Sequence, residues 1–112
     1  MQENDKPVLV YATFPSGEVA ETMGRQLVER RLAACVNILP GMTSIYRWEG
    51  RIERDSEVVV IIKTRASLAE AAMGAVKAGH PYTNPALLVI PVEAGAAPYI
   101  EWLLAQTAQA GT

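Results

Sequence analysis

The pattern of apolar and polar residues divides the chain into extended and helical segments. Three short, mostly apolar runs are typical of buried strands, and they span 8–14, 58–62 and 86–92. The stretch 33–64 predicts one very long β-hairpin, because two extended arms flank the turn dipeptide Glu49-Gly50. Pro40 and Gly41 fall inside the first arm and predict a bulge there rather than its end.

Apolar residues at helical spacing predict three helices. The expected spans are 17–31, 67–79 and 98–107. Ser16 is placed to cap the first helix, because its side-chain oxygen can accept a hydrogen bond from a backbone N–H of the first turn. Ser67 and Glu70 form a capping-box pattern at the start of the second. Pro98 suits the first turn of the third.

The element order predicts an α+β fold of the ferredoxin-like βαββαβ class, with a long hairpin between the second and third strands and an additional C-terminal helix. In this arrangement the strand order is fourth, first, third, second, and both crossover helices lie on one face of the sheet. Pro91 favours an edge position for the last strand. We expect a single domain over 1–112, with flexible ends at 1–6 and 108–112.

The hairpin is too long for the domain that carries it. An arm of about 14 residues spans about 46 Å, whereas a compact domain of this size is about 35 Å across. Tyr46, Trp48 and Ile52 lie near the tip, where exposure to water is costly. We therefore expect a symmetric oligomer in which Tyr46 and Trp48 contact a neighbouring subunit. The alternative is a shorter, bent hairpin that folds back onto its own core.

Composition narrows the class of protein. Half of the 112 residues are hydrophobic, which indicates one globular domain. The net charge of −2 argues against a basic surface for nucleic acid or membranes. The one cysteine, Cys35, cannot form an internal disulfide, and we interpret it as a small buried hydrophobe. The polar start of the chain lacks the apolar core of a signal peptide, so we expect a soluble cytoplasmic protein.

One cluster of polar residues is a candidate site. We expect the first and third strands to run parallel, which places the loop 80–85 near the ends of both. Lys63, His80 and Tyr82 would then converge in a small site for an anion or a metal. The alternative is that Lys63 is solvated and that His80 caps the preceding helix.

The sequence does not predict an enzyme. It contains one histidine, and no nucleophile, base and orienting group stand out together. An RNA-recognition domain of this fold needs aromatic residues on its third strand, and 58–62 has none. An acylphosphatase-like enzyme needs a basic residue in the loop after the first strand, and 14–17 has none.

Several motifs occur in order along the chain. They read RLAACVNILPG at 31–41, SIYRWEG at 44–50, IKT at 62–64 and HPY at 80–82. Together they resemble the CutA divalent-cation tolerance family, and the resemblance extends from about Val8 to Leu104. It implies a ferredoxin-like fold, a homotrimer assembled through the long hairpins, a cytoplasmic role in tolerance of copper and other divalent cations, and no enzymatic reaction.

The resemblance also implies a metal site and an alternative ligand. The family's copper ligands, a cysteine and two adjacent histidines, correspond here to Ala12, Gly79 and His80. Only His80 keeps a donor side chain, and Lys63 would repel a cation. The trimer also resembles PII-type signalling proteins. That likeness implies a regulatory trimer in which Lys63, His80 and Tyr82 bind a small anion in clefts between subunits.

Overall fold

The computed structural model describes residues 5–109, and its elements follow the expected order. They are β1 (Pro7–Phe14), α1 (Gly17–Glu29), β2 (Cys35–Trp48), β3 (Arg51–Arg65), a 3-10 turn (Ala66–Leu68), α2 (Ala69–Gly79), β4 (Leu87–Pro91) and α3 (Ala97–Gln106). Within residues 5–109, no helix is long and apolar enough to cross a membrane.

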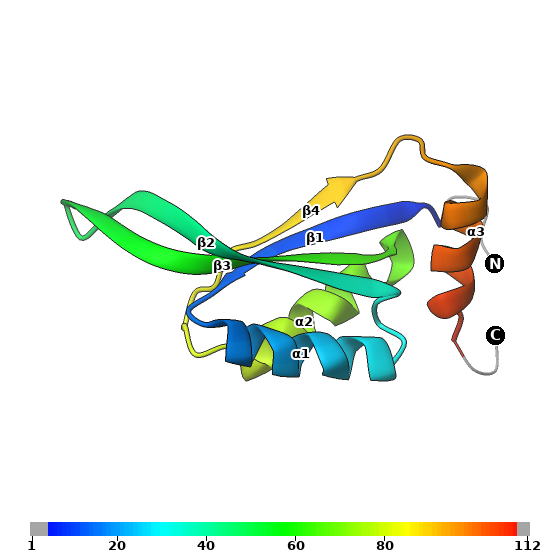
Figure 1. The fold of residues 1–112 in the computed structure, drawn as a ribbon, viewed down its shortest axis with the longest axis horizontal. Helices are drawn as coiled ribbons and strands as arrows, with labels where there is room; N and C mark the ends of the chain where they lie inside the picture. Colours follow the sequence, from blue (N-terminus) through cyan, green and yellow to red (C-terminus); the bar gives the residue numbers. More distant parts are fainter. Residues whose placement is uncertain (1–4, 110–112) are drawn as a thin grey trace.

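The four strands form one sheet in the order β2-β3-β1-β4, and every neighbouring pair is antiparallel. Helices α1 and α2 cover one face of this sheet, and α3 stands at the end remote from the hairpin tip (Figure 1). This arrangement confirms the α+β, ferredoxin-like fold with an additional C-terminal helix. Strand β4 lies at an edge, as Pro91 predicted.

The hydrophobic core lies between the sheet and helices α1 and α2. Alternate residues of the two central strands face it, as the two-residue period of a strand requires. Those that belong to the buried core cluster are Val10, Ala12 and Phe14 of β1 and Val58, Val60 and Ile62 of β3. Helix α1 comes close to β2 at Gly24, where a Cβ atom would lie 3.1 Å from Val36 Cγ1.

The hairpin of β2 and β3 has the predicted turn and bulge. Glu49 and Gly50 both have positive φ, 48° and 79°, as a two-residue type I′ turn requires. The pairing register shifts between Leu39 and Met42, and Gly41 adopts a φ of 84° at this bulge.

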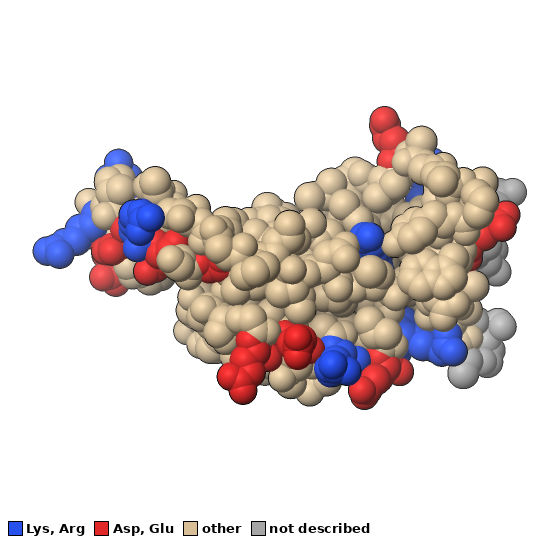
Figure 2. All heavy atoms as spheres, in the orientation of Figure 1, with Lys and Arg blue, Asp and Glu red and all other residues tan. Residues whose placement is uncertain are grey.

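The hairpin projects beyond the body of the domain (Figure 1), and the longest extent of the molecule is 47 Å. The shorter, folded-back hairpin was therefore the wrong alternative. Charged groups gather at the hairpin tip and along α1, with mostly uncharged surface between them (Figure 2).

Of the two helix caps predicted from the sequence, one is present in the structure and the other is not. Ser16 caps α1, since its Oγ accepts a hydrogen bond from the Val19 N–H at 3.3 Å. The capping box at Ser67 was wrong. Ser67 lies in the 3-10 turn, α2 begins at Ala69, and the Ser67 hydroxyl donates instead to Asp5 Oδ2 at 2.7 Å. Ser67 thus bonds to Asp5, which is distant in sequence, and does not cap the helix as the local pattern predicted.

Asp5 belongs to a buried polar network that ties the start of the chain to α3. Arg65 Nη1 lies 3.1 Å from Asp5 Oδ2, and Arg65 Nε donates to Thr107 Oγ1 at 2.9 Å. The Arg65 guanidinium also donates to the Leu104 carbonyl. Burial on its own would raise the pKa of Asp5, but the hydrogen bonds from Ser67 and Arg65 together hold it below its ordinary value.

The described parts of the two ends, where flexibility was expected, make hydrogen bonds to the rest of the domain. Asp5 is buried, and the Lys6 carbonyl accepts from the Ala66 N–H at 2.8 Å. At the other end, Gln109 Nε2 donates to the Arg31 carbonyl at 3.0 Å. The remaining parts of those expected ends, 1–4 and 110–112, lie outside the described residues.

Candidate functional site

The expected meeting of Lys63 with His80 and Tyr82 within one chain was wrong. Strands β1 and β3 are antiparallel, so Phe14 pairs with Val58 and Leu9 pairs with Lys63. The crossover through α1 makes β2 parallel to β1, and the hairpin then reverses β3. Lys63 therefore lies toward the start of β1, whereas His80 lies at its end.

His80 makes contacts with both of its ring nitrogens. Nε2 lies 2.7 Å from the Thr13 carbonyl oxygen, and Nδ1 accepts a hydrogen bond from the Tyr82 N–H at 3.0 Å. The ring also stacks near Phe14 and Tyr82, with centroid distances of 4.5 and 4.9 Å. A neutral imidazole protonated at Nε2 satisfies both bonds, because one nitrogen then donates and the other accepts. The backbone N–H of His80 closes the end of α2 by donating to the Lys77 carbonyl at 3.3 Å.

Tyr82 is held beside the base of the hairpin. Its side chain remains partly exposed, and burial of the phenol raises its pKa, with the negative charges of Glu57 and Asp55 adding to the effect. The loop after α2 and the acidic residues of β3 therefore share one region of the molecule.

A second phenol is tied directly to the hairpin carboxylates. The Tyr46 hydroxyl donates to Asp55 Oδ2, and this bond raises the pKa of Tyr46 to about 12. In the pairing register, Tyr46 stands opposite Glu53. Glu53, Asp55 and Glu57 alternate along β3, so they lie on the face of the hairpin that also carries Tyr46. This face presents phenols and carboxylates together.

Lys63 belongs to a different group of side chains. It stands opposite Cys35 in the pairing of β2 with β3, and its Nζ donates to the Tyr99 hydroxyl at 3.1 Å. The Tyr99 bond raises the pKa of Lys63 against the opposing effect of burial. Cys35 is partly exposed rather than buried. Sequence reasoning missed this pairing, although counting residues back from the Glu49-Gly50 turn and allowing for the bulge would have found it.

The residues at the copper position do not fit the ligand set that the resemblance implies. Ala12 is fully buried and has no donor atom, and Gly79 has no side chain. A Cβ atom at Gly79 would lie 2.5 Å from Met23 Cε, so a methionine methyl group fills this space. Among the described residues, no group of three or more His, Cys, Asp and Glu side chains is arranged to hold a metal ion.

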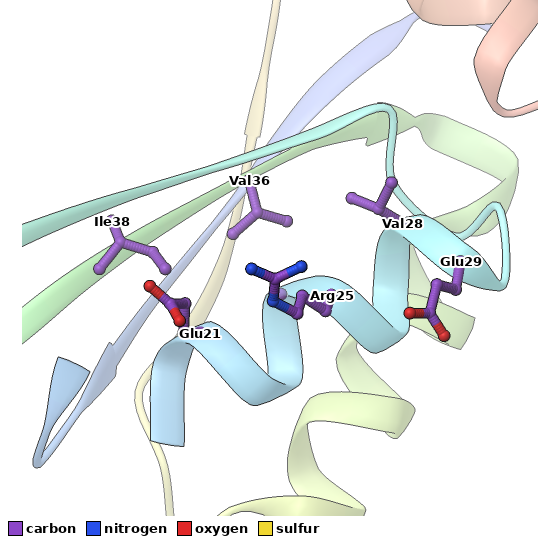
Figure 3. Close-up of a pocket in the computed structure, with 7 residues that line it drawn as sticks. Glu21, Arg25, Val28, Glu29, Val36 and Ile38 are labelled. Atoms are coloured by element: carbon purple, nitrogen blue, oxygen red, sulfur yellow. The ribbon is translucent and has the colours of Figure 1, made fainter. Parts of the chain in front are cut away.

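A groove between α1 and β2 was not predicted. It measures about 330 Å³ and is lined mainly by α1, with Val36 and Ile38 of β2 on its other side. In Figure 3, Arg25 extends from α1 toward Val36, and Glu21 lies near Ile38. The charges of α1 thus border an apolar strip of the edge strand.

Comparisons with known proteins agree with the fold. The model of the family described as CutA1 divalent ion tolerance protein matches residues 8–106. The chain is 46% identical over 99 residues to the divalent-cation tolerance protein CutA of Thermus thermophilus, covering 88% of this chain and 96% of the relative. It is 47% identical over 93 residues to human protein CutA, covering 83% of this chain and 52% of the relative.

Solved structures are similar over nearly the whole chain. The crystal structure of CutA1 from Oryza sativa has a TM-score of 0.91 at 38% identity, covering 97% of this chain and 100% of that chain. The Thermus thermophilus structure has a TM-score of 0.88 at 45% identity, covering 91% and 99%. The chain spans 52% of the human relative and 58% of the chloroplastic relative from Arabidopsis thaliana.

Proposed function

Because the chain belongs to the CutA1 divalent ion tolerance family, we propose that it is a non-enzymatic homotrimer that contributes to divalent-cation tolerance in the cytoplasm. The names of its bacterial relatives support the link to divalent cations. The exposed apolar residues of the projecting hairpin support the assembly.

The hairpin surface is the observation that carries the proposal of a trimer. Ile45, Trp48 and Ile52 are 70%, 56% and 64% exposed in the single chain. Burial of such a side chain is worth about 1.5–3 kcal/mol, so their exposure favours association. Leu88 and Ile90 of β4, at the opposite edge of the sheet, are 61% and 45% exposed. Two unlike apolar surfaces suit head-to-tail contacts between copies, and such contacts form a ring when the rotation from one copy to the next closes.

The mass in solution tests the assembly. Sedimentation equilibrium at micromolar concentration should give three times the chain mass of 12.1 kDa. A stable monomer of unchanged fold would refute the trimer. The tolerance role has a separate test, in which a bacterium lacking its own family member is grown at raised cupric ion. Expression of this chain should restore growth, and failure by a trimeric, soluble protein would count against the role.

A second candidate is a regulatory trimer that binds a small anion, as PII-type proteins suggest. The supporting observation is Lys63, whose ammonium contacts a phenol and has no carboxylate partner among the described residues. Lys63 and Tyr82 lie at opposite ends of β1 within one chain. A site that uses both therefore needs Lys63 from one subunit and the His80–Tyr82 loop from the next.

Thermal shift separates the two candidates. Inorganic phosphate, a nucleoside triphosphate, zinc and cupric ion are each added to the protein and to Lys63→Met, with Lys77→Met as a control lysine on α2. A ligand at about 100 times its Kd stabilises by about 2.7 kcal/mol. Stabilisation by an anion that only Lys63→Met removes favours the regulatory trimer. The absence of any anion effect excludes it.

A further inference from the structure

We infer that His80 braces the loop after α2 against β1, and that it does not bind copper. The family resemblance placed a metal ligand at this residue. In the structure, its ring instead joins two backbone groups, the Thr13 carbonyl and the Tyr82 N–H. This assignment is independent of the trimer, because all of its contacts lie within one chain.

The first argument is the count of lone pairs. A neutral imidazole has one ring nitrogen that donates a proton and one that accepts. Nε2, 2.7 Å from a carbonyl oxygen, can only donate there, so Nδ1 carries the available lone pair. The Tyr82 N–H already points at Nδ1 from 3.0 Å. A metal ion at Nδ1 would have to replace this hydrogen bond and move the backbone of Tyr82.

The second argument is what surrounds the ring. Phe14 and Tyr82 both pack against the ring, with centroids at 4.5 and 4.9 Å. The positions that would supply further ligands hold Ala12 and Gly79, and the methyl group of Met23 occupies the space beside Gly79. Copper prefers several soft or imidazole ligands together. The His80 imidazole is instead surrounded by aromatic rings and backbone groups, which are not copper ligands of this kind.

The third argument is what the brace achieves. His80 ends α2, and the chain must cross from there to β4, where Leu87 pairs with Ala12. Anchoring the ring to the Thr13 carbonyl fixes the first part of this connection to the C-terminal end of strand β1. Tyr82 is thereby held near Asp55 and Glu57 at the base of the hairpin. His80 is thus a positioning residue for Tyr82.

Two variants of His80 distinguish a residue that holds the loop in place from a residue that binds copper. His80→Ala removes both ring contacts. His80→Asn keeps a short acceptor that can take the Tyr82 N–H, but it lacks an imidazole for copper. Thr83→Ala, an exposed change in the same loop, is the matched control. All are compared as the full chain, so chelation by the amino terminus is common to every sample.

If His80 positions the loop and does not bind copper, calorimetry with cupric ion at neutral pH should give copper affinities that agree within twofold for the unmutated protein and the three variants. Hydrogen exchange at the Tyr82 amide should be at least tenfold faster in His80→Ala than in the unmutated protein. In His80→Asn it should be slower than in His80→Ala. A tenfold or larger loss of copper affinity in both His80 variants would overturn the inference. Unchanged Tyr82 exchange in His80→Ala would overturn it equally.

A measurement on the unmutated protein covers the case in which His80→Ala fails to fold. Nitrogen NMR of the labelled imidazole should show a proton on Nε2 and none on Nδ1. This pattern should persist with one equivalent of zinc, and one equivalent of cupric ion should not selectively broaden the ring signals. Selective broadening, or a proton on Nδ1, would show that the assigned bonds are wrong. Loss of the trimer in a separate mass measurement would leave these results unaffected.

Discussion

Asp5 and Arg65 show how a single pair can hold separate parts of a small domain together. Their side chains are only 6% and 9% exposed, and the carboxylate also accepts from the backbone and side chain of Ser67. Arg65 in turn reaches Thr107 and the Leu104 carbonyl. Breaking one member of a buried ion pair typically costs about 3–5 kcal/mol, because the other charge is left without compensation.

The depressed pKa of Asp5 gives a pH dependence with a definite sign. A carboxyl whose pKa is lowered by folding contributes stability above its unfolded value of 3.8, and the contribution is lost as pH falls through the native value. We expect the melting temperature of the protein to exceed that of Asp5→Asn at pH 6. The difference should shrink between pH 4 and pH 2, measured at one protein concentration. Glu101→Gln, an exposed change on α3, is the control, and a difference independent of pH would contradict the assignment.

At the scale of elements, two glycines should respond in opposite directions to the same substitution. Gly50 sits in the hairpin turn at a φ of 79°, a conformation that costs an L-residue about 1–2 kcal/mol. Gly74 lies inside α2, and among the described residues no tertiary neighbour lies within 4 Å of the place where a Cβ atom would be. There alanine should stabilise by about 0.4–1 kcal/mol, because it restricts the unfolded chain. Urea unfolding should show Gly50→Ala destabilised and Gly74→Ala stabilised, and equal signs would contradict these backbone assignments.

The elements show which features of the fold the sequence could predict. The hairpin, its turn and its bulge followed from local signals at Glu49, Gly50 and Gly41, each of which depends on few neighbouring residues. The antiparallel direction of β1 and β3 also follows from the predicted crossover and hairpin, but the hypothesis took the two strands as parallel. Lys63 was consequently assigned to the wrong end of the sheet, and its neighbour Cys35 was missed.

The His80 loop shows a different limit. The residue types at 80–82 made the loop a candidate site, but the residue to which an imidazole bonds depends on atoms far away in sequence. The Thr13 carbonyl lies 67 positions earlier, and Asp5 lies 62 positions before Ser67. No local spacing encodes such pairs. The His80–Thr13 and Ser67–Asp5 contacts depend on the folded sheet, which brings these distant segments together.

At the scale of the whole molecule, the hairpin tip should determine assembly. Trp48 is 56% exposed in the single chain, on a ribbon that projects from its domain. Two-stranded ribbons are marginal alone, so burial against another copy would stabilise this one. We expect Trp48→Ala to weaken the trimer by about 3–5 kcal/mol, the typical cost of truncating a buried aromatic residue. Val28→Ala, an exposed apolar change in the α1 groove, should leave the assembly intact.

Sedimentation equilibrium across a range of concentrations measures this difference directly. The protein and Val28→Ala should remain at three times 12.1 kDa, while Trp48→Ala should dissociate as it is diluted. Its melting temperature should also become concentration-dependent, since association stabilises the folded chain by mass action. If Trp48→Ala kept both the mass and the melting temperature of the unmutated protein, the hairpin tip would not be an anchor. The contacts of a trimer would then have to come from the exposed apolar residues of β4, so Leu88→Ala is the next variant to measure.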